Sequence, residues 1–107
     1  MSYTIACLNI HCVKTASERD PVYRIFLDDQ LIVERRFWPD APEYFIQEQI
    51  TLEDDDGEHN IWVKNVFGDR GRIRVHEVNF FDGDTRKPLD LGAENRSGRY
   101  TFKTVKR

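Results

Sequence analysis

The sequence predicts an all-β fold, an antiparallel β-sandwich with a jelly-roll-like arrangement, formed by a single domain over residues 1–107. Apolar and polar residues alternate with a period of two from end to end, and no long stretch keeps the spacing of an amphipathic helix. Turn-forming residues interrupt this alternation after about ten residues each time, which divides the chain into roughly seven or eight short strands. A chain of 107 residues can bury one core without a metal or a disulfide.

The amino-terminal part of the chain contains a strand, a loop and a hairpin. The strand covers residues 4–12, and five of its residues share one face: Thr4, Ala6, Leu8, Ile10 and Cys12. The polar segment 15–21 is a loop, because Pro21 cannot donate a hydrogen bond to a sheet. Residues 22–38 form a hairpin joined by Asp28, Asp29 and Gln30, since Asp tolerates tight turn conformations although the usual glycine is missing.

The rest of the chain is predicted to form four more strands that are separated by turns. Pro39 and Pro42 precede a strand at residues 43–52, and Glu48 on its apolar face indicates a bulge or an edge position. The last strand is basic, so it is guarded as an edge by its own Lys and Arg, or it pairs with an acidic edge of a neighbouring molecule. The other predicted elements are strands at 59–66, 72–81 and 99–105 and turns at 53–58, 82–88 and 94–98.

Charge is distributed unevenly along the chain. The net charge is −3, but residues 1–63 contain 5 basic and 13 acidic residues, while residues 64–107 contain 11 and 6. Such asymmetry holds two sheets in register or lets one copy dock on another, so protein partners or self-association are expected. An acidic surface repels phosphates, which makes nucleic acid the weaker alternative; that alternative rests on the alternating Arg72 and Arg74.

The cysteines, the hydropathy and the first residues indicate whether disulfides, a membrane span or a signal peptide are expected. Cys7 and Cys12 would lie about 16 Å apart on opposite faces of a strand, so both are expected to be free thiols. No apolar run approaches the roughly 18 residues that a membrane span requires. The first residues show no basic region followed by an apolar one, so we expect no signal peptide and synthesis in a cytoplasm.

From the sequence we do not expect the protein to be an enzyme. His11, His59 and His76 are scattered, and no nucleophile elbow, His-Glu metal motif or phosphate-binding loop is present. Carboxylates lie mainly in turns, where their pKa values are expected to stay near those of free side chains. The three aspartates at 54–56 are expected to form a solvated turn, because consecutive carboxylates point in different directions and cannot share one ion.

The segments DGEHNIWVKN and GDRGRIRVHEVNFFDG resemble the closing half of small calcium-dependent, xylan-binding carbohydrate-binding modules. The resemblance implies an antiparallel β-sandwich and a calcium site that contacts sugar hydroxyls. In that family an Asp follows the Asn of the strand end, whereas here Val66 follows Asn65, so Asp69 and Asn65 are the remaining side-chain candidates for calcium. The structural alternative is that Asp69 forms an ion pair with Arg70 or Arg72.

Aromatic residues are the other candidates for ligand contact. Trp38 borders a proline-rich loop, and Trp62 lies on the strand face opposite Ile61 and Val63. Flat rings stack on sugars and also anchor protein interfaces, while packing in the core is the alternative. The candidate ligand-binding residues are therefore Asn65, Asp69, Arg70, Trp38 and Trp62.

Together these features predict a non-catalytic binding or structural module. Secreted modules of the family it resembles are appended to catalytic domains, so a lone module without a signal peptide suits an accessory protein of a tailed-phage particle, such as a capsid decoration, tail or fibre protein. Glycan recognition, with or without calcium, is the first alternative. Nucleic-acid binding through Arg72 and Arg74 is the second.

Overall fold

The computed structural model describes residues 2–13, 21–36, 43–67, 72–96 and 98–105, which form nine strands and no helix. None of the described residues therefore belongs to a helix that could cross a membrane. The predicted all-β class is confirmed, and the tail adds two short strands to the expected number. The strands are β1 (Tyr3–Val13), β2 (Val22–Leu27), β3 (Gln30–Arg36), β4 (Glu43–Glu53), β5 (Gly57–Asn65), β6 (Arg72–Asp82), β7 (Pro88–Leu89), β8 (Glu94–Arg96) and β9 (Arg99–Thr104).

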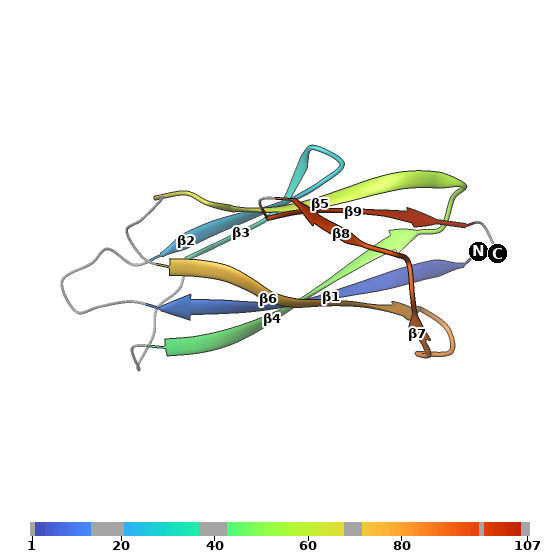
Figure 1. The fold of residues 1–107 in the computed structure, drawn as a ribbon, viewed down its shortest axis with the longest axis horizontal. Coiled ribbons are helices and arrows are strands. Elements are labelled where there is room, and N and C mark those ends of the chain that lie inside the picture. Colours follow the sequence, from blue (N-terminus) through green and yellow to red (C-terminus); the bar gives the residue numbers. More distant parts are fainter. Residues whose placement is uncertain (1, 14–20, 37–42, 68–71, 97, 106–107) are drawn as a thin grey trace.

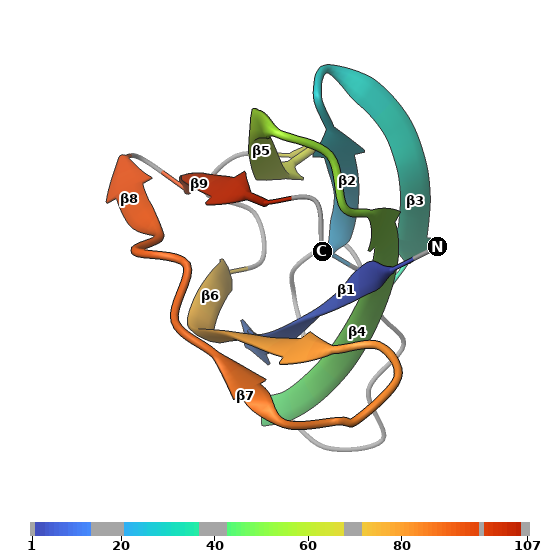
Figure 2. The same ribbon diagram turned by 90° about the vertical axis from the view of Figure 1, so that its right-hand side faces the viewer.

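The strands pair antiparallel in two sheets. The four-stranded sheet has the order β4-β1-β6-β7, and the five-stranded sheet has the order β3-β2-β5-β9-β8. The two sheets form separate layers of a β-sandwich, with the segment after β7 crossing from one layer to the other (Figures 1 and 2). Strands β3 and β4 lie at one side of the sandwich, and β7 and β8 lie at the other (Figure 2).

One hydrophobic core fills the space between the sheets. The inward face predicted for β1 is confirmed, because Ala6, Leu8 and Ile10 are fully buried, but Ile5 and Cys7 on its other face are buried too. Across the sandwich, the rings of Phe80 on β6 and Phe102 on β9 lie 4.6 Å apart. The other buried members of the core are Cys12, Tyr23, Ile25, Ile50, Leu52 and Ile61.

Strand β6 contains a bulge that keeps both of its halves facing the core. Its pairing with β1 shifts register between Asn9 and Ile10. Ile73 and Val78 both pack against the core although they are an odd number of positions apart, which a regular strand would not allow. The bulge expected at Glu48 is wrong, since β4 pairs with β1 without any shift, but the edge position expected there is confirmed.

Glu48 points inward from this edge strand and joins the two sheets. The Tyr23 hydroxyl on β2 donates a 2.6 Å hydrogen bond to its Oε1 atom, and Arg35 on β3 donates to the same oxygen. Burial, followed by the hydrogen bond to Glu48, raises the pKa of Tyr23 well above its usual value, so the phenol stays protonated and can donate. These contacts explain how a carboxylate is tolerated inside.

Three further expectations concern the first hairpin, the last strand and the two cysteines. The predicted hairpin is confirmed: Asp28 and Asp29 have positive φ angles of 49° and 66°, the pattern of a type I′ turn. The edge position expected for the basic last strand is wrong, because β9 lies between β5 and β8. Cys7 and Cys12 are buried free thiols as predicted, and burial raises the pKa of Cys12 to about 11.

Candidate functional site

Two of the predicted ligand-binding residues, Trp62 and Asn65, line the same cleft. The cleft has a volume of about 470 Å³ and lies where the end of β5 and the start of β6 meet the β8–β9 turn. Arg74, which the nucleic-acid alternative singled out, lines it as well. The remaining lining residues are Val63, Lys64, Ile73, Val75, Asn95, Gly98 and Tyr100.

Strand alternation gives the cleft an apolar floor and a polar rim. Val63 and Ile73 pack against the core, so they form part of the floor. Their neighbours Lys64 and Arg74 are exposed and point away from the core, as the period of two requires. The sequence therefore places aliphatic side chains and cations next to one another at this end of the sandwich.

The β8–β9 turn is held against β5 by hydrogen bonds. The backbone N–H of Val63 donates to the carbonyl of Gly98 over 3.3 Å, and Gly98 has a φ of 82°, which favours glycine. The Asn95 Oδ1 atom accepts from the N–H of Gly98 at 3.1 Å, and its Nδ2 atom donates to the Tyr100 hydroxyl at 3.2 Å. Burial raises the pKa of Tyr100, so this hydroxyl stays protonated and its proton can be donated to a ligand.

Trp62 stands on the outer face of the five-stranded sheet rather than in the core. Phe26, Trp62 and Arg99 are direct neighbours on β2, β5 and β9. The Phe26 ring stacks on the indole at 5.3 Å, and the Arg99 guanidinium lies over it at 4.9 Å. Because β5 lies between β2 and β9, these two groups flank the indole, so it offers the cleft an edge rather than an open face.

Asn65 holds the chain where it leaves β5. Its Oδ1 atom accepts a 3.3 Å hydrogen bond from the N–H of Phe67, and the N–H of Val66 donates to the carbonyl of Val22 at 2.9 Å. The other predicted ligand residues, Asp69, Arg70 and Trp38, lie outside the described residues. The Asp69 ion pair therefore stays a prediction.

Calcium coordination also stays a prediction. Among the residues that the structure describes, no three of His, Cys, Asp or Glu are grouped so as to hold a metal ion. Asn65 is the one calcium candidate within this part of the chain, and a single amide is far from the six to eight oxygens that calcium takes.

The electrostatics of the cleft favour an anion. Lys64 and Arg74 line it, and Arg99 lies beside it over the Trp62 ring. No described lining residue is a carboxylate, although Asp29, outside the cleft, lies 3.6 Å from Arg99. Amides, a phenol and cations above an aliphatic floor are suited to hold a polar, negatively charged molecule through hydrogen bonds.

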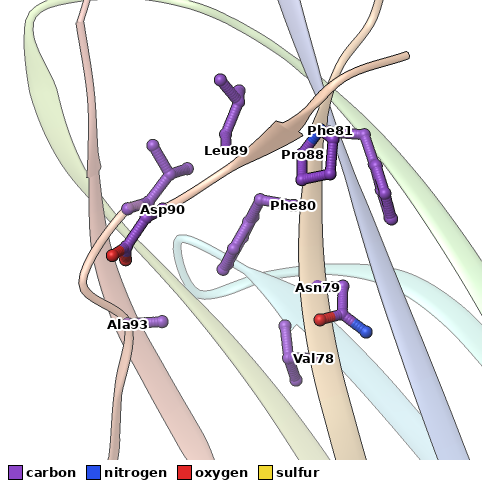
Figure 3. A pocket seen from close by; sticks show the side chains of 9 residues that line it. Val78, Asn79, Phe80, Phe81, Pro88, Leu89, Asp90 and Ala93 are labelled. Carbon is purple, nitrogen blue, oxygen red and sulfur yellow. The ribbon is translucent and has the colours of Figure 1, made fainter.

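A second cleft, of about 520 Å³, lies at the other end of the same side of the sandwich. Figure 3 shows Phe80 and Val78 on β6 beside the segment that carries Leu89, Asp90 and Ala93. Its walls are largely apolar, and only Asn79 and Asp90 add polar side chains. It therefore has few groups that would orient a polar ligand.

The structure also forms a cluster around His59 that the sequence analysis missed. The His59 Nδ1 atom lies 2.6 Å from Asp28 Oδ2, and its Nε2 atom lies 2.7 Å from Asp55 Oδ1. Burial alone would lower the pKa of His59, but the hydrogen bonds to both carboxylates outweigh it and raise this pKa. The hydrogen bond from His59 is also the main reason that the pKa of Asp55 is lowered.

The solvated turn expected at residues 54–56 is wrong for Asp54, which is buried, whereas Asp55 and Asp56 are exposed as expected. Asp54 is buried and accepts a hydrogen bond from the Thr4 hydroxyl, while its N–H donates to the carbonyl of Ser2. Asp55 binds His59 and the hydroxyl of Thr104. Thr4 and Thr104 are about 50 residues away from these aspartates, so local spacing could not reveal those contacts.

Comparisons with protein-family models, with curated proteins and with solved structures found no match for this chain. The resemblance to calcium-dependent carbohydrate-binding modules therefore stays a prediction. The cleft itself combines hydrogen-bond donors and acceptors with positively charged side chains.

Proposed function

We propose that the protein is a non-catalytic binding module that holds an acidic carbohydrate in the cleft between β5, β6 and the β8–β9 turn. The observation that supports this proposal is the convergence of Asn65, Arg74 and Asn95 from three separate segments on one concave site. Concave sites with a few convergent polar groups are where small ligands bind in most proteins.

The chemistry of the rim favours a carbohydrate with negative charges. Asn95 and Tyr100 carry groups that both donate and accept hydrogen bonds, as sugar hydroxyls do. Lys64 and Arg74 supply charged donors for a carboxylate or a sulfate. None of the described lining residues is a carboxylate, a histidine or a cysteine, which are common catalytic bases and nucleophiles, and we propose binding without turnover.

Several finer expectations remain predictions beside this proposal. A jelly-roll-like arrangement resembling carbohydrate-binding modules, a calcium ion near Asn65 and Asp69, and a place in a tailed-phage particle are each compatible with glycan binding. The proposal itself depends on none of them, because its groups all come from Trp62–Asn65, Ile73–Val75 and the β8–β9 turn.

Isothermal titration calorimetry on the full chain tests the proposal. The probes are hexasaccharides from heparin and from polygalacturonate, which differ in carrying sulfate or only carboxylate, together with neutral xylohexaose and a single-stranded DNA oligonucleotide. We expect at least one acidic hexasaccharide to bind more tightly than xylohexaose. Repeating the titration with calcium and with a chelator shows whether a metal contributes.

Matched variants connect this binding to the cleft. The double variant Lys64→Gln/Arg74→Gln should lower the affinity by roughly tenfold or more, since each charge-assisted hydrogen bond contributes about 1.5 kcal/mol or more. The control Lys87→Gln/Lys103→Gln removes the same charge away from the cleft and should change little. Equal losses in both variants, tighter binding of the DNA, or no heat with any probe would each contradict the proposal.

A further inference from the structure

The outer face of the four-stranded sheet adjoins the cleft at Arg74. Arg74 lines the cleft, pairs with His11 across the sheet, and His11 pairs in turn with Phe45. These residues form one row over β6, β1 and β4, which is about 10 Å wide at a strand spacing of about 4.8 Å. The surface therefore runs from the cleft across three strands.

Phe45 provides an exposed ring at the far end of this row. It lies on the edge strand β4 and is 53% exposed. Its ring stacks on His11 at 4.6 Å and an interplanar angle of 16°, and it meets His76 edge-on at 5.6 Å. His11 also contacts the carboxylate of Glu43, so several neighbours hold the ring in place.

Four side-chain amides lie on the same face beside this row. By register, Asn9 lies between Gln47 and the carboxylate of Glu77, and Cys7 lies between Gln49 and Asn79. Gln47, Gln49 and Asn79 are exposed, while Asn9 is half-buried. Within the described residues, none of these four amides forms a side-chain hydrogen bond, so each keeps a donor and an acceptor for a ligand.

On the outer face of the five-stranded sheet, two of the arginines already have partners. Arg24 donates to Glu34 at 2.7 Å, and Arg99 lies over Trp62 and 3.6 Å from Asp29. The described side-chain amides without a side-chain hydrogen bond that adjoin the cleft's Arg74 row lie on the face that carries Asn9 and Phe45.

We infer that the ligand is a chain of several sugars, which leaves the cleft past Arg74 and crosses the outer face of the four-stranded sheet. Asn9 and Gln47 hydrogen-bond its hydroxyls, and Phe45 stacks on the CH-rich face of one ring. Amides suit hydroxyls because both groups donate and accept. This inference rests on the proposed function and adds that the site is extended rather than confined to the cleft.

The length dependence of binding tests the inference. The disaccharide and the hexasaccharide of heparin and of polygalacturonate are titrated into the full chain and into the triple variant Asn9→Ala/Gln47→Ala/Phe45→Ala. The hexasaccharide should bind the unmodified chain more tightly than the disaccharide. In the triple variant its affinity should fall by roughly tenfold or more, because two hydrogen-bonding amides and one stacking ring are removed together. The affinity of the disaccharide should stay unchanged.

The control variant Glu58→Gln/Thr101→Ala alters the outer face of the five-stranded sheet and should bind both lengths normally. Circular dichroism on each variant verifies that it is folded, and Gln47→Ala alone is the replacement if the triple variant is not. Equal affinity for the two lengths, or an equal loss in variant and control, would overturn the extended site while leaving the cleft in place. No heat with either length would instead overturn the proposed function and this inference with it.

Discussion

Glu48 and His59 each bind two partners through one side chain, but their surroundings differ. The side chains of Glu48 and His59 are 8% and 13% exposed. Glu48 lies between the sheets, and its partner Tyr23 is fully buried. His59 lies at a turn, and its partners Asp28 and Asp55 are largely exposed. The difference shows that the cost of losing a polar residue depends on whether its partners can return to water.

The largest effect is expected at Glu48. Glu48→Ala removes the acceptor of the Tyr23 hydroxyl, which would then be buried without a partner, and it leaves a cavity beside Arg35. We expect the free energy of unfolding to fall by about 3 kcal/mol, measured by urea denaturation. The control is Glu53→Ala at the exposed end of the same strand, which should cost about 0.5 kcal/mol or less. Similar losses in the two variants would mean that the Tyr23–Glu48–Arg35 contacts add no stability.

A smaller effect is expected at Asp28, on the exposed side of the comparison. Its Oδ1 atom accepts a 2.9 Å hydrogen bond from the N–H of Asn60, and its φ is positive. Asp28→Ala loses this bond, the His59 contact and the tolerance of Asp for that conformation, so we expect a loss of about 2 kcal/mol. Asp28→Asn keeps the Asn60 bond and the conformation, and should recover about half of the loss. If Asn were no better than Ala, the charge on Asp28 would dominate.

The stability that the His59 cluster contributes is expected to depend on pH. The pKa of His59 is raised above its ordinary value of 6.5, so its contribution is complete below that pH and is lost as the pH rises through the folded pKa. The pKa of Asp55 is lowered below 3.8, so its contribution is complete above that pH and is lost as the pH falls through its folded pKa. The cluster is most stabilising between these two values.

Melting temperatures measured from acidic to alkaline pH test this expectation. The difference between the unmodified chain and His59→Gln should shrink as the pH rises past the folded pKa of His59. The control is His76→Gln, because His76 contacts the Phe45 ring and forms no ion pair among the described residues. A pH-independent difference for His59→Gln would show that the ring packs but does not exchange a proton within this range.

The two clusters also show how far the sequence could predict the structure. The period of two identified the buried face of β1, and the misplaced charge of Glu48 correctly indicated an edge strand. The partners of Glu48 could not be predicted, because Tyr23 and Arg35 belong to the opposite sheet, and local patterns do not determine how two sheets face each other. The same holds for His59, whose partner Asp28 comes from a turn 31 residues away.

The candidate site was predictable to a similar extent. Asn65 and Trp62 were identified as possible ligand contacts from their strand and their residue types, and both line the cleft. Asn95 and Tyr100 were not predicted to contact a ligand. The sequence of the β8–β9 turn is that of an ordinary surface turn, and its packing against Val63 is known only from the structure. Concave sites formed by three segments depend on tertiary structure, so sequence spacing reveals only part of them.

The smallest predicted effect concerns Asp29, the neighbour of Asp28 in the same turn. Asp29 has a φ of 66°, and its side chain is 76% exposed. Among the described residues, this side chain makes one contact, a long 3.6 Å ion pair with Arg99. Asp29→Gly produces the Asp-Gly pair that type I′ turns favour, and an exposed ion pair adds little stability. We therefore expect a gain of about 0.5 kcal/mol in the free energy of unfolding, with the His59 pH profile unchanged. A loss would mean that Arg99 needs Asp29 to keep its place over Trp62, which tryptophan fluorescence of the variant would report.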